Sequence, residues 1–252
     1  MDASGIGSMA QTMKYVIGSG WYCAKGRSFP NGGNVYSRSR QFHELWKHCV
    51  FKYSNPAGVL IVDSASPLLP NPDPREQVLR LDANYQNTDY LLSGWGRSFI
   101  ISAMYAYSCM ADLFYVEQDC LAMGNWVGDC YKQSTEYPNR FLAGKPYEDE
   151  RKVKHHALQM SLVFVPRTII LDLVKAFPNG PLDKGRDESQ LGLCGVPLAF
   201  HTFGSGRTRP YDLKAPTCEV QHWTDPEILE VADHLGLGDQ VHNDYQHRED
   251  WE

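Results

Sequence analysis

The sequence predicts a single α/β domain built on a mostly parallel central sheet that is flanked by helices. Apolar runs of strand length alternate with segments of helical periodicity through the first half of the chain. The runs at 59–62 and 113–116 are apolar without interruption, which is typical of strands covered on both faces. With 252 residues, 42% of them hydrophobic, the chain is long enough to bury a sizeable core.

The first half is predicted to run strand, helix, strand, helix, strand. The apolar segment 13–17 forms the first strand, and Gly18-Ser19-Gly20 is its turn. Apolar residues then recur at helical spacing from Phe42 to Tyr53. A loop with four prolines at 67–74 and a helix at 91–110 complete the order. This alternation predicts strands that run parallel to one another.

The second half is less regular. Residues 124–150 are polar and are expected to be irregular, and 162–165 is a further strand. Thr168 is a plausible N-cap for the helix that follows. Asp225-Pro226-Glu227 begins a short helix that should stop near Gly236, and a polar tail completes the chain.

Composition excludes several classes of protein. A net charge of −6 argues against a nucleic-acid coat and against attraction to an anionic membrane. The seven cysteines form no C-x-x-C motif, so we expect buried, reduced thiols in a soluble cytoplasmic protein. The apolar run 98–116 contains Ser102, Ser108 and Asp112, which favours a helix followed by a strand over an integral membrane segment.

Two carboxylates, Glu117 and Asp119, follow directly on the apolar strand at 113–116. A carboxylate is costly to bury without a partner, so a pair of them at the end of a buried strand predicts a bound cation. Hard divalent ions such as Mg²⁺ or Mn²⁺ take oxygen ligands and keep positions open for phosphate oxygens. Asp63 ends the preceding strand, and ligands bind beyond the carboxyl ends of strands in an open parallel sheet.

This layout resembles the GT-A class of nucleotide-sugar glycosyltransferases. Their D-x-D motif, often varied to E-x-D, ends a central strand, and Glu117-Gln118-Asp119 is similar to that variant. The resemblance covers roughly residues 13 to 210 and consists of layout and short motifs. It implies a GT-A-like catalytic domain at 13–218, with a donor-binding half at about 13–123 and an acceptor-binding half at about 124–218. A flexible leader at 1–12 and a C-terminal helix with a polar tail at 219–252 lie outside this domain.

The resemblance also implies roles for individual residues. Glu117 and Asp119 would hold Mn²⁺ or Mg²⁺, and His201 would be a further metal ligand from a C-terminal segment. Asp187 or Glu188 would be the catalytic base that deprotonates the acceptor hydroxyl. The residues expected to receive the nucleotide at the ends of the first strands are Gly18, Ser19, Gly20, Asp63 and Arg97.

The segment FHTFGSGRTRP at 200–210 is suited to a diphosphate. Its glycines, Gly204 and Gly206, allow the backbone N–H groups to converge on an anion. Arg207 and Arg209 add forked guanidinium donors that match phosphate geometry. We therefore expect both arginines to belong to the nucleotide-binding site.

The function predicted from these residues is a metal-dependent glycosyltransferase, a hexosyl- or pentosyltransferase of carbohydrate biosynthesis. It would move a sugar from a nucleoside-diphosphate sugar, such as a UDP-sugar, to a hydroxyl of a glycan or other acceptor. Breaking the sugar–diphosphate bond puts negative charge on the leaving phosphate, and a bound metal ion would neutralise that charge.

Three other functions were weighed. Gly18-Ser19-Gly20 suggests a dinucleotide-binding oxidoreductase, but the third glycine of G-x-G-x-x-G would be Cys23. A nucleotidyltransferase shares the α/β layout, but the N-terminal region has no glycine-rich phosphate loop followed by a basic residue. The remaining alternative is a non-catalytic sugar- or nucleotide-binding protein, whose 6 Trp and 14 Tyr residues would include rings that stack on sugars.

Overall fold

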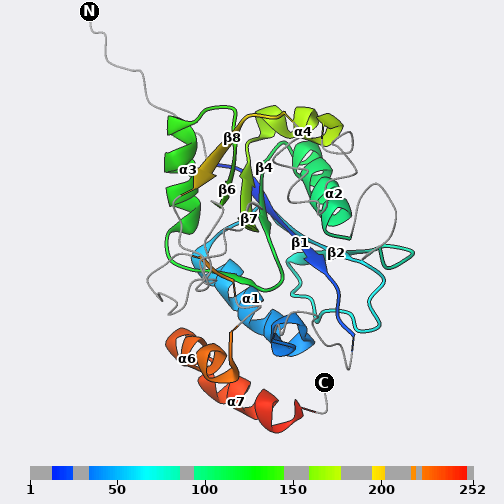
Figure 1. Cartoon of the computed structure of the whole chain (residues 1–252), viewed down its shortest axis with the longest axis vertical. Helices are drawn as coiled ribbons and strands as arrows, with labels where there is room; N and C mark the ends of the chain where they lie inside the picture. The colour runs from blue at the N-terminus through cyan, green and yellow to red at the C-terminus, as the bar shows by residue number, and fades with distance from the viewer. Residues whose placement is uncertain are drawn as a thin grey trace, which may run out of the picture.

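The computed structural model describes residues 13–24, 34–85, 94–144, 159–176, 195–201, 217–219 and 223–248. Its centre is a seven-stranded sheet with the order β3-β2-β1-β4-β7-β6-β8, and helices cover both of its faces (Figure 1). The predicted α/β fold with a mostly parallel central sheet flanked by helices is therefore confirmed. The strands of this sheet are β1 Tyr15–Trp21, β2 Gly58–Asp63, β3 Glu76–Arg80, β4 Asp112–Val116, β6 Phe141–Gly144, β7 Gln159–Val165 and β8 Leu198–His201.

Only β7 runs against its neighbours. It pairs antiparallel with β4 on one side and with β6 on the other, whereas the remaining pairs of the sheet are parallel. The carboxyl ends of β1, β2, β4 and β8 consequently lie at one edge of the sheet. A second, two-stranded sheet joins β5 (Cys120–Ala122), directly after the acidic pair, to β9 (Thr217–Glu219).

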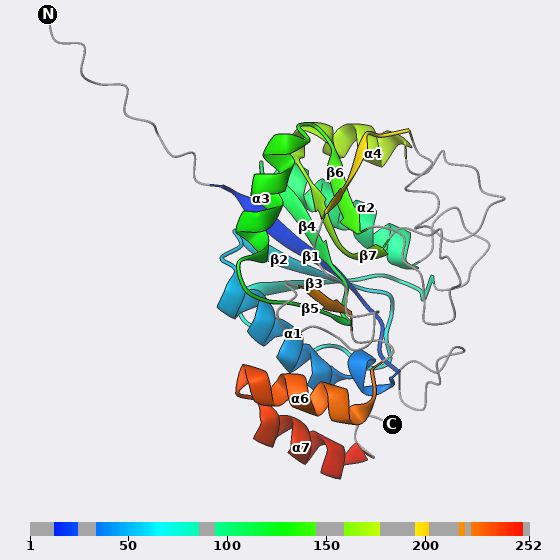
Figure 2. The same ribbon diagram turned by 60° about the vertical axis from the view of Figure 1, so that its left-hand side comes forward.

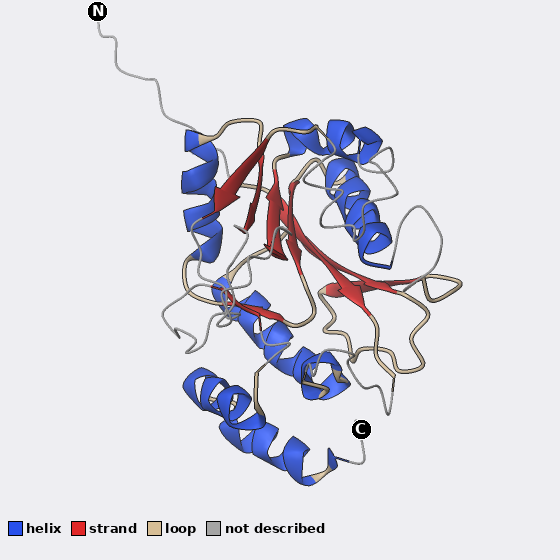
Figure 3. Cartoon of the chain, viewed as in Figure 1, coloured by secondary structure: helices blue, strands red, loops and turns tan. Residues whose placement is uncertain are grey.

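The helices divide between two hydrophobic clusters. One cluster joins α1, α3, α6 and α7 to one face of the sheet, and the other joins α2 and α4 to the opposite face. Figure 3 shows helices on both sides of the strands. The helical segments are η1 Tyr36–Arg38, α1 Arg40–Tyr53, α2 Gly94–Ser108, α3 Trp126–Glu136, η2 Arg167–Ile169, α4 Ile170–Ala176, α6 Asp225–Leu235 and α7 Gly238–Gln246.

The two C-terminal helices pack on the α1 side of the molecule, as Figure 2 shows from a second direction. Thr224 and Glu227 form a capping box at the start of α6, and Gly236 ends the helix in the left-handed region at φ 80°. Helix α6 therefore ends where the sequence predicts. Among the described residues, no helix is both long and apolar enough to cross a membrane.

Several predicted elements are confirmed and others are wrong. The helices at 42–53 and 91–110 and the strands at 59–62, 113–116 and 162–165 are present, with shifted ends. The predicted irregular stretch 124–150 contains α3 and β6, and the predicted polar tail contains α7. Thr168 does not cap a helix. It lies inside η2, where its hydroxyl donates a hydrogen bond to Asn139 Oδ1 at 2.9 Å.

The predicted turn at Gly18-Ser19-Gly20 is also wrong, because these residues lie inside β1. The two glycines serve close packing between β1 and α2. A Cβ added at Gly18 would lie 2.4 Å from the side chain of Ser102, and one at Gly20 would lie 2.7 Å from Ser98 Oγ. Ser98 and Ser102 are one helical turn apart and face two strand positions on one side of β1.

Substitution of Gly18 by alanine is expected to destabilise the fold by about 1–3 kcal/mol, because the added methyl overpacks a buried helix–strand contact. Chemical denaturation followed by circular dichroism measures the change. The double variant Gly18→Ala/Ser102→Gly removes the clashing atoms and should recover part of the loss. An unchanged unfolding midpoint in the single variant would show that β1 and α2 are not this close.

Candidate functional site

Three of the predicted site residues, Asp63, Glu117 and Asp119, lie where the parallel strands end. Trp21 at the end of β1 is paired with Asp63 at the end of β2. On the other side of β1, Gly18 is paired with Tyr115 of β4, so Glu117 follows at the same edge. The structure thus brings Asp63 and the acidic pair to the carboxyl edge of the sheet, where open α/β sheets bind ligands.

Asp63 organises the turn that follows β2. Its carboxylate is fully buried, and Oδ1 accepts a hydrogen bond from the backbone N–H of Ser66 at 3.0 Å. Arg80 Nε lies 3.6 Å from Oδ2, which is an ion-pair distance but too long for a hydrogen bond. Within this turn Ala65 has φ 52°, a conformation that costs a non-glycine residue about 1–2 kcal/mol. Asp63 therefore has a structural role, and its contact with a nucleotide stays a prediction.

Gln118, the middle residue of the E-x-D motif, ties the motif to the loop after β1. Its Oε1 accepts a hydrogen bond from the backbone N–H of Tyr22 at 2.8 Å, and its Nε2 donates to the Tyr22 carbonyl at 3.4 Å. The side chain is buried. These reciprocal bonds hold the ends of β1 and β4 in a fixed relation.

The backbone of Glu117 is fixed from two sides. Its N–H donates to the carbonyl of Ser161 on β7 at 2.9 Å, and its carbonyl accepts from the indole Nε1 of Trp46 on α1 at 3.0 Å. Trp46 is fully buried. The position of the motif is therefore set by contacts that lie 44 to 71 residues away in the sequence.

Asp119 is fully buried and forms an ion pair with Arg38 of η1. Both Nε and Nη2 of Arg38 donate to Asp119 Oδ2, at 3.1 and 2.7 Å. The other oxygen, Asp119 Oδ1, is enclosed by protein and has no hydrogen-bond partner among the described residues. A quarter of the Arg38 side chain remains exposed. The sequence interpretation missed Arg38, because nothing in the local pattern connects it to a residue 81 positions later.

This arrangement does not fit an open divalent-metal site. A metal ion requires carboxylate oxygens that face open coordination positions, but one Asp119 oxygen is taken by a guanidinium and the other is enclosed. Across the described ranges, no cluster of three or more His, Cys, Asp or Glu side chains could hold a metal ion. The side chain of His201, the third predicted ligand, lies outside the described side chains.

Tyr115 of β4 contributes a neutral hydroxyl near the acidic pair. Its Oη lies 2.5 Å from Ser98 Oγ on α2. Burial raises the pKa of Tyr115, Glu117 raises it further, and Arg38 opposes this shift. The Tyr115 hydroxyl therefore stays protonated at neutral pH and can donate a hydrogen bond.

Arg97 lies in the first turn of α2, at the end of the helix that meets the carboxyl edge. Its guanidinium stacks over the ring of Tyr85 at 3.8 Å from the ring centroid. The carbonyl of Tyr85 accepts from the N–H of Gly94 at 3.0 Å, and its N–H donates to Ser64 Oγ after β2. Because a helix N-terminus carries partial positive charge, Arg97 adds to a field that favours an anion at this edge.

The other predicted site residues are either outside the described residues or distant from the acidic pair. Asp187, Glu188, Arg207 and Arg209 lie outside the described residues. His201 ends β8 at the same edge of the sheet, but β8 is three strand spacings, or about 14 Å, from β4. The roles predicted for these residues stay predictions.

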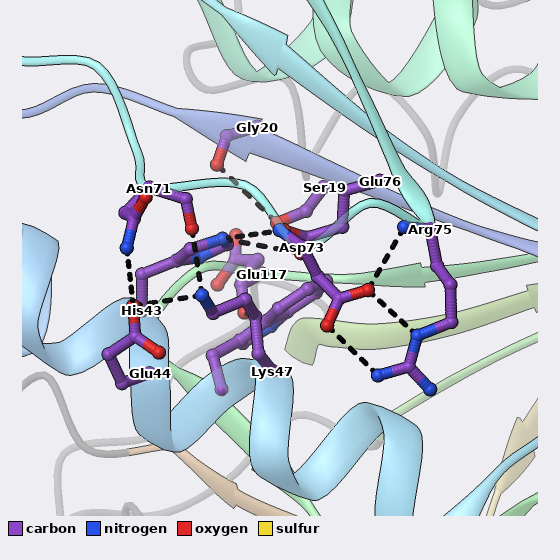
Figure 4. Close-up of polar contacts among 11 residues, drawn as sticks. Ser19, Gly20, His43, Glu44, Lys47, Asn71, Asp73, Arg75, Glu76 and Glu117 are labelled. Carbon is purple, nitrogen blue, oxygen red and sulfur yellow. Dashed lines mark hydrogen bonds and ion pairs between the residues drawn. The ribbon is translucent and has the colours of Figure 1, made fainter.

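A buried polar network, which the sequence interpretation also missed, supports α1 from the side of β3 (Figure 4). His43 Nε2 lies 3.2 Å from Glu76 Oε1, and both side chains are almost entirely buried. Glu76 Oε2 accepts from the backbone N–H of Asp73 at 2.7 Å, and His43 stacks on Trp46. The network fastens the proline-rich loop to α1 and so supports Trp46, which holds Glu117.

No family model and no curated protein matches the sequence. Solved structures are similar to the chain at low identity. TarS residues 1–349 of S. aureus have 12% identity and a TM-score of 0.48, covering 90% of this chain and 65% of that one. GalNAc-T7, solved with UDP, GalNAc and Mn²⁺, has 11% identity and a TM-score of 0.45 over 75% of this chain.

A third similar structure is 4-diphosphocytidyl-2C-methyl-D-erythritol synthase from Anaerococcus prevotii. It has 9% identity and a TM-score of 0.46, covering 88% of this chain and 96% of that one. The chain spans less than two thirds of the TarS fragment and 42% of the GalNAc-T7 chain. Likeness at this level assigns no activity to the chain.

Replacing Gln118 by alanine should destabilise the fold by about 0.5–1.5 kcal/mol, because the partly buried backbone N–H of Tyr22 loses its hydrogen bond to the Gln118 side chain. Denaturant unfolding of this variant gives the change in free energy. Gln240→Ala, at an exposed position of α7, is the matched control and should stay within about 0.5 kcal/mol of wild type. Equal losses in the two variants would contradict the bridging role of Gln118.

Proposed function

We propose that the chain is a glycosyltransferase that uses a nucleoside-diphosphate sugar and transfers the sugar to a hydroxyl of a glycan or other acceptor. The observation that carries the proposal is the presence of two arginines, one from each face of the sheet, at the edge where the E-x-D motif lies. Arg38 on the α1 side and Arg97 in the first turn of α2 lie at the carboxyl edge of the parallel sheet. Such an edge suits the anionic diphosphate of the donor.

The proposed reaction is a displacement at the anomeric carbon of the donor sugar. The acceptor oxygen bonds to the anomeric carbon as the bond from that carbon to the diphosphate oxygen breaks, and the electron pair leaves with the diphosphate. The acceptor proton passes to a base, for which Asp187 and Glu188 remain the candidates. Positive groups held near the diphosphate stabilise the charge that develops on it.

Two finer predictions belong to the same proposal. Use of Mn²⁺ or Mg²⁺ at Glu117 and Asp119 stays a prediction, which the pairing of Asp119 with Arg38 weighs against in the arrangement seen here. A cytoplasmic location is the second of these predictions.

Nucleoside diphosphates should raise the melting temperature of the protein more than the matching nucleosides do. A ligand at one hundred times its dissociation constant stabilises the folded state by about 2.7 kcal/mol, so the shift is readily measured. A panel of uridine, adenosine, guanosine and cytidine diphosphates, each in Mn²⁺, Mg²⁺ and EDTA, tests this. Absence of any shift across the whole panel would remove the support for a nucleotide-dependent transferase.

Variants of the predicted catalytic base distinguish sugar transfer from nucleotide binding alone. Asp187→Asn or Glu188→Gln should slow sugar transfer by about a hundredfold or more while nucleoside-diphosphate affinity is unchanged, because a general base acts on the chemical step. Release of nucleoside diphosphate from a sugar donor, with and without acceptor, is the measurement. Donor binding without any release in wild type would favour the non-catalytic sugar- or nucleotide-binding protein.

A further inference from the structure

Arg38 occupies the position beside Asp119 that the sequence assigns to a metal ion. Its guanidinium makes two hydrogen bonds to one oxygen of a fully buried carboxylate. A charge-assisted pair of this kind satisfies the need of the buried carboxylate for a cation. The carboxylate at the end of this apolar strand is therefore explained without a divalent ion.

The η1 segment that carries Arg38 is held by contacts of the neighbouring residues. Its neighbour Ser39 caps α1, accepting a hydrogen bond from the N–H of Phe42 at 3.0 Å. Tyr36 is fully buried and donates a hydrogen bond from its hydroxyl to Asp244 of α7 at 2.8 Å. The Tyr36 ring also lies 4.8 Å from that of Tyr245. The C-terminal helices thus brace the short η1 segment that presents Arg38.

The Arg38 side chain is not fully covered by the protein. A quarter of it is exposed. A planar guanidinium offers five N–H donors, and this shape lets one arginine serve a carboxylate and a phosphate together.

We propose that Arg38 is the cation of the E-x-D site and that it binds the diphosphate of the nucleotide substrate, so that binding there needs no divalent ion. The proposal rests on the proposed function, because it names how the same substrate is held. Asp119 then acts as a positioning residue that orients Arg38, while Arg38 itself touches the substrate.

The two accounts of Asp119 make opposite predictions for one variant. If Asp119 only orients Arg38, Asp119→Asn removes the negative charge that competes with the diphosphate for Arg38, and diphosphate affinity should stay within threefold of wild type or increase. If Asp119 is a metal ligand, the same change should abolish the Mn²⁺-dependent part of the affinity. Isothermal titration with the best binder among uridine, adenosine, guanosine and cytidine diphosphates, in EDTA and in Mn²⁺, separates them.

Arg38→Gln should weaken binding of that diphosphate about tenfold to a hundredfold in either buffer, while affinity for the matching nucleoside is unchanged. Because this variant leaves a buried carboxylate unpaired, it can fail to fold. The double variant Arg38→Gln/Asp119→Asn removes both charges and should show the same selective loss. Arg140→Gln, an exposed arginine near the amino end of β6, is the matched control and should bind as wild type.

Wild-type affinity in EDTA should lie within threefold of the value in Mn²⁺. The inference alone is overturned if EDTA abolishes diphosphate binding that Mn²⁺ restores, or if the folded double variant binds diphosphate as wild type does. If wild type binds no diphosphate in either buffer, the proposed function fails and the inference fails with it.

Discussion

The carboxyl edge of the sheet is organised around one partly buried ion pair, that between Arg38 and Asp119. A carboxylate with no exposed surface is tolerated because a guanidinium satisfies one of its oxygens twice. The pair joins a short helical turn before α1 to the loop after β4, two segments that are 81 residues apart. Removing the Arg38 charge would leave the buried Asp119 carboxylate without its ion-pair partner, whereas Arg38 keeps a quarter of its side chain exposed.

Other contacts at this edge hold the backbone around the ion pair in place. Gln118 bridges to the backbone of Tyr22, and Trp46 fixes the carbonyl of Glu117. The close approach of α2 to β1, which the two glycines of β1 permit, brings Ser98 to the hydroxyl of Tyr115. Each contact links the end of one strand to a neighbouring element. The ends of β1 and β4 are consequently held in a fixed arrangement, which is what the proposed binding of a diphosphate by Arg38 requires.

The sequence predicted the parallel strands well because continuous apolar runs report burial on both faces. The sequence-based prediction was wrong where the same local pattern occurs in two kinds of structure. The glycines at 18 and 20 are typical of a turn. In this fold they lie in a strand and leave room for the serines of α2, which lies about 80 residues later in the sequence. Helix α3 buries only Trp126, Val127 and Cys130, a stripe too narrow to stand out from its polar surroundings. Arg38 could not be found at all, since its partner is defined only by the tertiary fold.

The central claim is that Arg38 is both the partner of Asp119 and a ligand of the substrate diphosphate. Nuclear magnetic resonance of the arginine Nε–H groups tests it most directly, with Arg38→Gln used to assign the signal. The account predicts one Nε–H signal, protected from exchange, that moves when a nucleoside diphosphate is added in EDTA and loses its protection in Asp119→Asn. An Arg38 signal that nucleoside diphosphate shifts only when a divalent ion is present would contradict it.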